Sequence, residues 1–252
     1  MRDRPSRRRR LAGRGRARLN APETAEERRV LIVRAALDLL DADGFEQMSL
    51  RRLAGHLGMH APGLYWYIES KQDLIDSMAK EILDRGLADL QRPAQGAKWE
   101  DWLVDLACAI RTALLARRDG ARVAASSFLL ATGGLTPAIE IALEVLEDAG
   151  FEPLLALGVT MTIVRYAIGA ALGEQTSPMT AIADAGELER ATRNLVASVD
   201  AARWPHTAAA FQQLIEGDAR DRMGIRHRDR VFRWGAEILV RGIATYPKFS
   251  SP

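Results

Sequence analysis

Basic and aromatic side chains of the kinds that bind nucleic acid are gathered between residues 49 and 71. Arg51 and Arg52 stand near the start of this stretch, Lys71 stands at its end, and the run Tyr65-Trp66-Tyr67 lies between them. Arg, Lys, Ser and Tyr side chains make many of the contacts that proteins form with phosphate, and Arg also binds the exposed edge of guanine. The stretch therefore predicts contact with DNA.

Two short helices, over 49–57 and 61–67, are expected to present these groups. Ala54 is small enough to let the helices cross closely, and Gly58 accepts the positive φ of a tight turn. The apolar side chains that would hold the pair together are Leu50, Leu53, Leu57, Met59 and Leu64. The exposed positions near or on the second helix are then Ala61, Pro62, Gly63, Tyr65, Trp66 and Tyr67. This is the pattern of a helix-turn-helix, in which the second helix enters the major groove; a helical hairpin inside a larger bundle is the alternative.

Capping signals place these helices within a unit over residues 23–90. Thr24 and Glu27 form a capping box before a helix that Gly44 ends, and Ser70 with Asp73 opens a longer helix toward Leu90. Residues 97–248 form a second unit, for which helices are expected near 99–117, 136–150, 153–175, 187–203, 206–216 and 221–245. The 48% apolar content allows a substantial core, and no strand pattern is present. We therefore predict an all-α fold.

Residues 1–22 form a separate Arg-rich tail, which we expect to be disordered. Nine arginines fall within residues 1–18, so the rest of the chain is acidic, although the net charge is +2. The tail is either an incidental extension or a source of extra phosphate or minor-groove contacts.

Several other functions find no support in the sequence. The single cysteine, Cys108, cannot form an internal disulfide and is expected in the core, and the apolar run 154–164 ends at Arg165, short of the roughly 20 residues that span a bilayer. His56 and His60 flank the turn at Gly58, so we expect them on the surface rather than on a metal. No catalytic constellation or cofactor motif is evident. We expect a cytoplasmic protein that is not an enzyme and needs no cofactor.

Residues 24–86 closely resemble the DNA-binding domain of the TetR family. The resemblance lies in Gly44-Phe45, Ser49-Leu50-Arg51-Arg52-Leu53-Ala54, Leu57-Gly58 and Leu64-Tyr65-Trp66-Tyr67, followed by Lys71 and Leu74. It implies that Arg51 reads a base, that Ser49 and Tyr65 hold phosphate, that Lys71 clamps the backbone, and that Pro62, Gly63 and Trp66 lie along the groove. Ala61 and Gly63 replace larger or polar residues of the tetracycline-repressor branch, so the operator sequence is expected to differ.

The resemblance extends into the second unit. Residues 118–123 resemble the segment after the second body helix of tetracycline repressors, and 232–242 resemble their last dimerisation helix. Homodimerisation through the helices near 153–175 and 221–245 is implied. Gly235 and Gly242 would let a partner helix approach closely; ordinary packing against 153–175 is the alternative.

The ligand site departs from that of the tetracycline repressors. Their magnesium-binding histidine and glutamate correspond to Ala124 and Gly173, and Glu174 stands one residue later. We therefore expect an apolar ligand that is not magnesium–tetracycline, and no metal. By resemblance its pocket is lined by Leu87, Leu106, Ile110, Ser127, Leu157, Thr160, Met161 and Arg165. We expect Arg165 to pair with Glu140 or Glu144; alternatively it anchors an acidic group of the ligand.

These features together predict a homodimeric repressor on a palindromic operator. Ligand binding would move the helix over 70–90 and spoil the spacing of the two DNA-binding units. A regulator or activator that needs no small molecule, and a helical enzyme or ligand carrier, are the alternatives.

Overall fold

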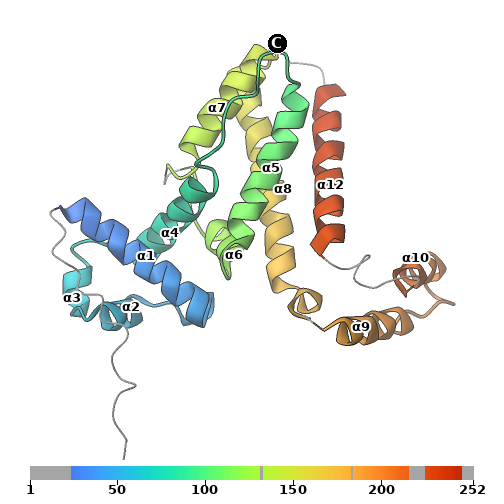
Figure 1. The fold of residues 1–252 in the computed structure, drawn as a ribbon, viewed down its shortest axis with the longest axis horizontal. Helices are drawn as coiled ribbons and strands as arrows, with labels where there is room; N and C mark the ends of the chain where they lie inside the picture. The colour runs from blue at the N-terminus through green and yellow to red at the C-terminus, as the bar shows by residue number, and fades with distance from the viewer. Residues whose placement is uncertain (1–23, 131–132, 183, 216–224, 246–252) are drawn as a thin grey trace, which may run out of the picture.

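A computed structural model of the protein describes residues 24–130, 133–182, 184–215 and 225–245 (Figure 1). The regular structure of these residues is entirely helical, which confirms the predicted all-α fold. The Arg-rich tail over 1–22 and the last residues of the predicted second unit lie outside the described residues.

The N-terminal unit, which we call the head, consists of four α-helices and one short 3₁₀ helix. They are α1 (Ala25–Asp43), η1 (Phe45–Gln47), α2 (Leu50–Leu57), α3 (Ala61–Leu64) and α4 (Lys71–Gly86). The predicted capping box opens α1: the Thr24 hydroxyl accepts from the Glu27 amide at 3.2 Å, and the Glu27 carboxylate accepts from the Thr24 amide at 3.1 Å. Leu53, Leu64 and Leu74 are completely buried, so α2, α3 and α4 share one core with α1.

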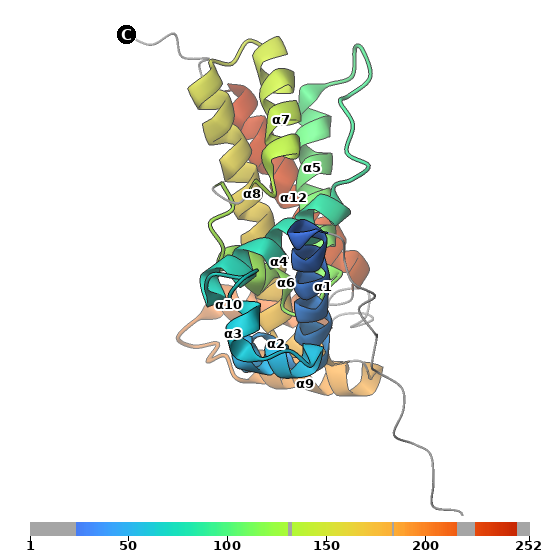
Figure 2. The same cartoon turned by 90° about the vertical axis from the view of Figure 1, so that its left-hand side faces the viewer.

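The C-terminal unit, the body, is built around one long helix. Its helices are α5 (Trp99–Leu115), α6 (Gly120–Ala125), α7 (Thr136–Asp148), α8 (Pro153–Thr176), η2 (Pro178–Ala181), α9 (Ala185–Ala197), α10 (Pro205–Ile215) and α12 (Ile225–Thr245). α8 contacts α5, α6, α7 and α12, and the head lies beside the end of the body formed by α6 (Figures 1 and 2).

α8 is longer than the sequence argument about membrane spanning assumed. We considered only residues 154–164, but the helix has 24 residues, and an 18-residue window in it reaches a mean hydropathy of 1.7, enough to cross a membrane by length and composition. In this fold 44% of that window is buried inside the protein, where it builds the core between α5 and α7.

The α9–α10 hairpin stands away from the rest of the body. α9 and α10 contact each other, and they extend from the end of α8 on the side opposite the head (Figure 1). Leu188 and Thr192 of α9 are buried. α9 is shorter than expected, because it ends at Ala197 rather than near 203, whereas α10 has the expected length.

The helix expected over 61–67 is shorter in the structure, and two other helix ends have defined local geometry. Gly44 ends α1 with φ 83° and ψ 168°, a conformation that favours glycine but is not left-handed helical. α3 ends at Leu64, and Tyr65–Tyr67 form a turn. Thr136 is the first residue of α7, and Leu135 precedes it as the N-cap.

Candidate nucleic-acid interface and ligand groove

The turn between α2 and α3 has the geometry of a helix-turn-helix. Gly58 ends α2 in the left-handed conformation, with φ 66° and ψ 23°, as the sequence predicted. Its amide hydrogen bonds the carbonyl of Gly55, and the Met59 amide bonds that of Ala54, so the chain turns sharply into α3. Ala54 is buried at the crossing of the two helices, where a larger side chain would separate them.

The predicted DNA-binding residues share one exposed region of the head. Trp66 is 86% exposed and Tyr65 is 55% exposed, which is unusual for side chains of this size. The other exposed members are Ser49, Arg51, Arg52, Pro62 and Lys71, whereas Ala61, Gly63 and Tyr67 are half-buried. Their roles in DNA binding remain predictions.

Arg29 fixes the turn that carries the aromatic residues. Its guanidinium donates to the carbonyl of Tyr67 at 2.5 Å, forms an ion pair with Asp73, and donates to the Ser77 hydroxyl at 2.8 Å. Burial alone would raise the pKa of Asp73, but the bonds from Arg29 and from the Glu69 amide outweigh it and hold the pKa below its usual value. α1 supplies Arg29 and α4 supplies Asp73. The position of the turn over Tyr65–Tyr67, which we call the recognition turn, therefore depends on both helices. The sequence analysis missed Arg29.

Two of the predicted DNA-binding residues also have structural partners. The Ser49 hydroxyl caps α2 by accepting from the Arg52 amide at 3.2 Å. The Arg52 side chain forms an ion pair with Asp43 at 2.8 Å. Arg51 is exposed, and its guanidinium forms no ion pair with another residue in the described part of the chain.

Head and body are joined by the packing of α4 on α5 and α6 and by two sets of hydrogen bonds. At the end of α1, the Phe45 amide donates to the Asp119 carboxylate at 2.8 Å, and Arg118 donates to the carbonyl of Ala42 at 2.9 Å. At the start of α4, Gln72 donates to the carbonyl of Ser126 at 2.9 Å, and the Phe128 amide donates to Asp76 at 2.9 Å. The second junction connects α4 to the chain immediately after α6.

An apolar groove of about 600 Å³ begins at this second junction. It lies between the segment that follows α6 and the outer side of α8. Its lining residues are Ala124, Ala125, Ser127, Phe128, Leu129, Leu130, Met161, Val164, Arg165, Ile168, Gly169 and Leu172. Phe128 also lines a second groove, between α1 and α4. This apolar groove is therefore in direct contact with the connection to the head.

Three of the eight predicted ligand-binding residues, Ser127, Met161 and Arg165, line this groove. Three others, Leu106, Ile110 and Thr160, are at most 1% exposed and pack in the core of the body. Leu87 and Leu157 are half-buried beside that core. The sequence analysis did not foresee that the groove lies on the α6 side of α8 rather than between α5 and α8.

The expected partner of Arg165 is wrong. Glu144 forms an ion pair with Arg92 at 3.1 Å, and within the described part of the chain no ion pair or hydrogen bond joins Arg165 to Glu140 or Glu144. The Arg165 side chain is exposed at the edge of the apolar groove.

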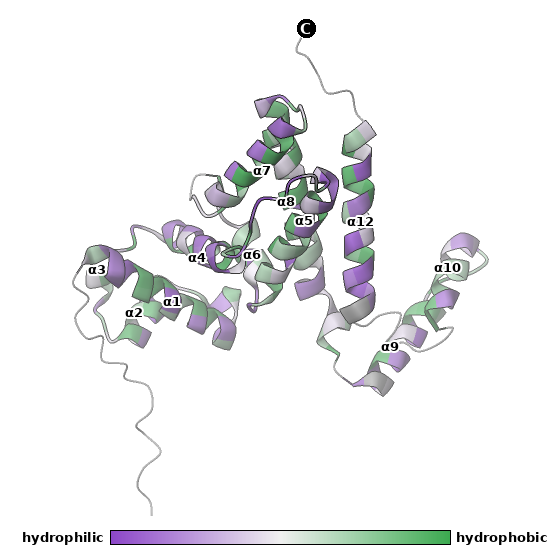
Figure 3. Cartoon of the chain, turned by 45° about the horizontal axis from the view of Figure 1, so that its top comes forward, coloured by the Kyte–Doolittle hydropathy of each residue, from purple (hydrophilic) through white to green (hydrophobic). Residues whose placement is uncertain are grey.

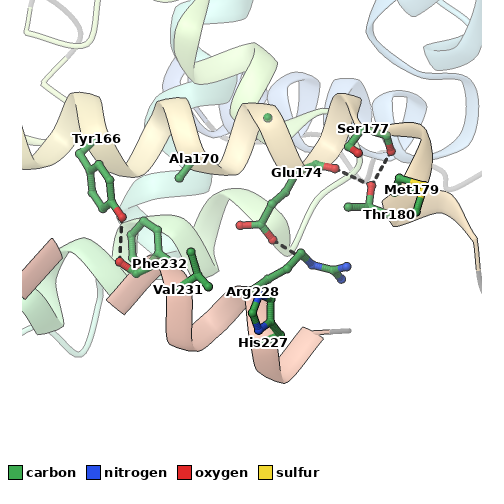
Figure 4. Close-up of a pocket in the computed structure, with 11 residues that line it drawn as sticks. Tyr166, Ala170, Glu174, Ser177, Met179, Thr180, His227, Arg228, Val231 and Phe232 are labelled. Atoms are coloured by element: carbon green, nitrogen blue, oxygen red, sulfur yellow. Dashed lines mark hydrogen bonds and ion pairs between the residues drawn. The ribbon is translucent and has the colours of Figure 1, made fainter. Parts of the chain in front are cut away.

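A second cavity, of about 370 Å³, lies between α8 and the first half of α12 (Figure 4). Beside it the Tyr166 hydroxyl donates to the carbonyl of Phe232 at 2.8 Å, and the two rings stack with centroids 4.9 Å apart. A Cβ at Gly235 would collide with the Tyr166 hydroxyl. Gly235 therefore serves close packing within the chain, whereas nothing approaches Gly242 within 4 Å of a Cβ.

Glu174, which we considered as a metal ligand, is held by arginines. Its carboxylate accepts from Arg111 at 2.6 and 2.9 Å and lies 3.4 Å from Nε of Arg228. Ala124 is 1% exposed within α6 and has no ligand atom. Among the residues described, no group of three or more His, Cys, Asp or Glu side chains is placed to hold a metal ion. The donor set therefore does not fit a magnesium site.

The two units match two family models. Residues 32–78 match the bacterial regulatory proteins of the tetR family, and residues 92–246 match the tetracyclin repressor-like C-terminal domain. The tetracycline repressor of class A from transposon 1721 of Escherichia coli is 35% identical over 205 residues, which are 78% of this chain and 92% of that protein.

Solved structures agree with these matches. A possible TetR-family regulator from Streptomyces coelicolor A3(2) has a TM-score of 0.66 and 29% identity, over 86% of this chain and 98% of its own. ActR of Streptomyces coelicolor, in complex with actinorhodin, has a TM-score of 0.68 and 25% identity, over 89% and 98%. The chain thus belongs to the TetR family, whose members are DNA-binding transcriptional regulators and not enzymes.

Proposed function

We propose that this chain is a ligand-responsive repressor that binds a palindromic operator as a homodimer in the cytoplasm and releases it when a small apolar acid binds the groove beside α8. The observation that carries the DNA-binding part is the exposure of Tyr65 and Trp66 on the turn that Arg29 fixes. Exposing large aromatic side chains to water is unfavourable, so their exposure on a rigid turn indicates a surface that binds a partner. Arg51 and Lys71 would add base-edge and phosphate contacts.

The outer sides of α8 and α12 support the homodimer. Val231, Trp234 and Ile238 of α12 are 48–63% exposed and recur at helical spacing. On α8, Gly158 leaves open space for a neighbouring helix, and Figure 3 shows α12 alternating between apolar and polar residues. Such stripes suit a four-helix interface between two copies. The two heads would then meet successive major grooves roughly 34 Å apart.

The lining of the groove supports a mostly apolar ligand with one acidic group. Apart from Ser127 and Arg165, its side chains are apolar. The Ser127 hydroxyl already donates to the carbonyl of Ala124 at 2.9 Å. The Arg165 guanidinium is thus the main polar group available to orient a ligand, and it matches a carboxylate or phenolate. Because Glu174 is engaged by Arg111, we propose that the ligand requires no magnesium.

The contacts after α6 offer a route from ligand to DNA. A ligand that displaces Phe128 or Ser127 would disturb the hydrogen bonds to Asp76 and Gln72 of α4. α4 holds Arg29 through Asp73, so its movement would shift the recognition turn. Changing the balance of the two states from 1:99 to 99:1 needs a difference in ligand affinity of about 10⁴, or ~5.5 kcal/mol.

Selection of random-sequence DNA on the purified protein tests the first part of the proposal. We expect a palindromic consensus, and recovery of sequences without symmetry would contradict it. Aromatic carboxylic acids and their methyl esters are then screened for release of the selected DNA. The acids should act and the esters should not, and Arg165→Gln should abolish the difference while leaving DNA affinity unchanged.

The screen also separates the alternatives. DNA release by magnesium with tetracycline at the concentrations that release class A repressor would contradict the metal-free ligand. DNA binding that no apolar acid or neutral analogue affects would favour a regulator without a small-molecule inducer.

A further inference from the structure

α12 packs against α5 and α8, and Tyr166 of α8 stacks on the Phe232 ring and donates to the Phe232 carbonyl. Among residues 227–245 of α12, the buried ones are Phe232, Ala236 and Val240. Asp229 stands three residues before Phe232 and therefore lies on the same side of the helix. The exposed stripe of Val231, Trp234 and Ile238 lies on the opposite side. The buried residues lie on one side of the helix, so polar contacts on that side, beside the Tyr166 bond and the Arg233–Asp105 ion pair, help to fix the angle of α12.

Arg111 of α5 is placed to supply those contacts. Its side chain is 8% exposed. The guanidinium donates to Glu174 of α8 from Nε at 2.6 Å and from Nη2 at 2.9 Å, and to Asp229 of α12 from Nη1 at 2.9 Å. The guanidinium carbon also lies 4.9 Å from the centroid of the Phe232 ring. One side chain therefore joins the three helices α5, α8 and α12.

The guanidinium remains charged in this position. Burial alone would lower the pKa of Arg111, but its bonds to Glu174 and Asp229 outweigh burial and raise the pKa. An ion pair of this kind contributes little net stability, because the cost of desolvation offsets the attraction. Such an ion pair does fix geometry. Because the planar guanidinium is held by two bonds to Glu174, its remaining N–H group points in one defined direction, toward Asp229.

We propose that Arg111 is a positioning residue for dimer assembly: by fixing α12 against α5 and α8 through Asp229 and Glu174, it sets the orientation of the exposed stripe that the second copy contacts. This inference rests on the proposed homodimer. A small tilt of α12 would be transmitted through the interface to both heads and would change the distance between them. Arg111 therefore influences operator spacing although it lies far from the DNA-binding turn in the chain.

Asp229→Ala tests the proposal without leaving a buried charge unpaired, because Asp229 is 55% exposed and Arg111 keeps Glu174. Sedimentation equilibrium should show a dimer dissociation constant raised about tenfold, the order of a lost charged hydrogen bond. Asp229→Glu, which keeps a carboxylate on α12, should recover most of the loss. Arg92→Met removes an exposed ion pair between other elements and should leave the constant unchanged.

A second variant separates positioning from stability. Arg111→Met combined with Glu174→Gln removes both charges of the buried pair, leaves an amide oxygen beside Nε of Arg228, and should fold with a melting temperature near that of the wild type. We expect it to dimerise weakly and to lose the preference for the selected palindrome over palindromes with one base pair added or removed at the centre.

Wild-type dimer constants and spacing preference in both Asp229→Ala and the double variant would overturn the inference. A wild-type protein that is itself monomeric would instead overturn the proposed homodimer, so the two failures are distinguishable.

Discussion

The backbone N–H of Phe45 donates a 2.8 Å hydrogen bond to the carboxylate of Asp119, which connects the end of α1 to the start of α6. Asp119 holds φ 54°, and it is the one non-glycine residue with positive φ among those that the structure describes. A left-handed backbone places the carboxylate toward the head, so a strained residue forms the first junction between head and body.

We predict that Asp119→Ala lowers the free energy of unfolding by about 1–3 kcal/mol, because it keeps a Cβ at positive φ but loses the carboxylate and its bond to Phe45. Asp119→Gly should cost less, since glycine adopts this φ freely, and Asp119→Asn should cost least. Urea denaturation of the three variants provides the comparison. A larger loss for glycine than for alanine would show that backbone strain is unimportant here.

Trp66→Ala should separate folding from DNA binding. Because Trp66 is 86% exposed, the unfolding free energy should change by less than about 0.5 kcal/mol. Affinity for the selected operator should fall by about tenfold or more, since a good base or backbone contact contributes ~1–3 kcal/mol. Fluorescence anisotropy with labelled operator measures the loss.

Leu64→Ala is the matched control in the same turn. Leu64 is completely buried, so its truncation should destabilise the head by about 2–5 kcal/mol. A Trp66→Ala protein that binds DNA normally would refute the assigned interface.

Asp73 predicts a specific dependence of stability on pH. Its pKa in the folded protein is lower than the ordinary value of 3.8, so the ionised form is favoured by folding. The resulting stabilisation is fully present above pH 3.8 and is lost as the pH falls from 3.8 through the lower folded pKa. Asp73→Asn should therefore be less stable than the wild type at pH 7, and the difference should shrink toward pH 2.5. A difference that stays constant with pH would contradict this assignment.

Gly235→Ala and Gly242→Ala should have opposite effects on the isolated chain. At Gly235 the new methyl group collides with the Tyr166 hydroxyl, so we expect a loss of about 1–3 kcal/mol. At Gly242 the space is open, so alanine should stabilise α12 by about 0.5–1 kcal/mol. If Gly242 lies in the dimer interface, the same variant should nevertheless weaken the dimer. Equal melting temperatures for the two variants would contradict the packing of α12 on α8.

Local features of the fold could be predicted from the sequence, and long-range partners could not. The Thr24 capping box and the turn at Gly58 depend on residues three or four positions apart, and both are present. By contrast, Arg111 finds Glu174 and Asp229 at separations of 63 and 118 residues. Nothing in the local sequence marks such partners, because they depend on how three helices meet.

The same reasoning explains the errors at the candidate sites. From the sequence, Gly235 could pack against a helix of the second copy or against a helix of its own chain. The structure shows the second case, because Tyr166, 69 residues earlier, packs on it. Glu140 and Glu144 of α7 were plausible ion-pair partners for Arg165, but Glu144 forms an ion pair with Arg92 instead. The helix positions of charged residues do not show which of two arginines binds a given carboxylate.

The stoichiometry of the DNA complex tests the central claim most directly. Sedimentation velocity of the protein with the selected operator should show two chains on the intact palindrome, and the complex should dissociate when an apolar acid that binds the groove is added. One chain on the full palindrome, or a complex that persists when the groove is saturated, would contradict the account.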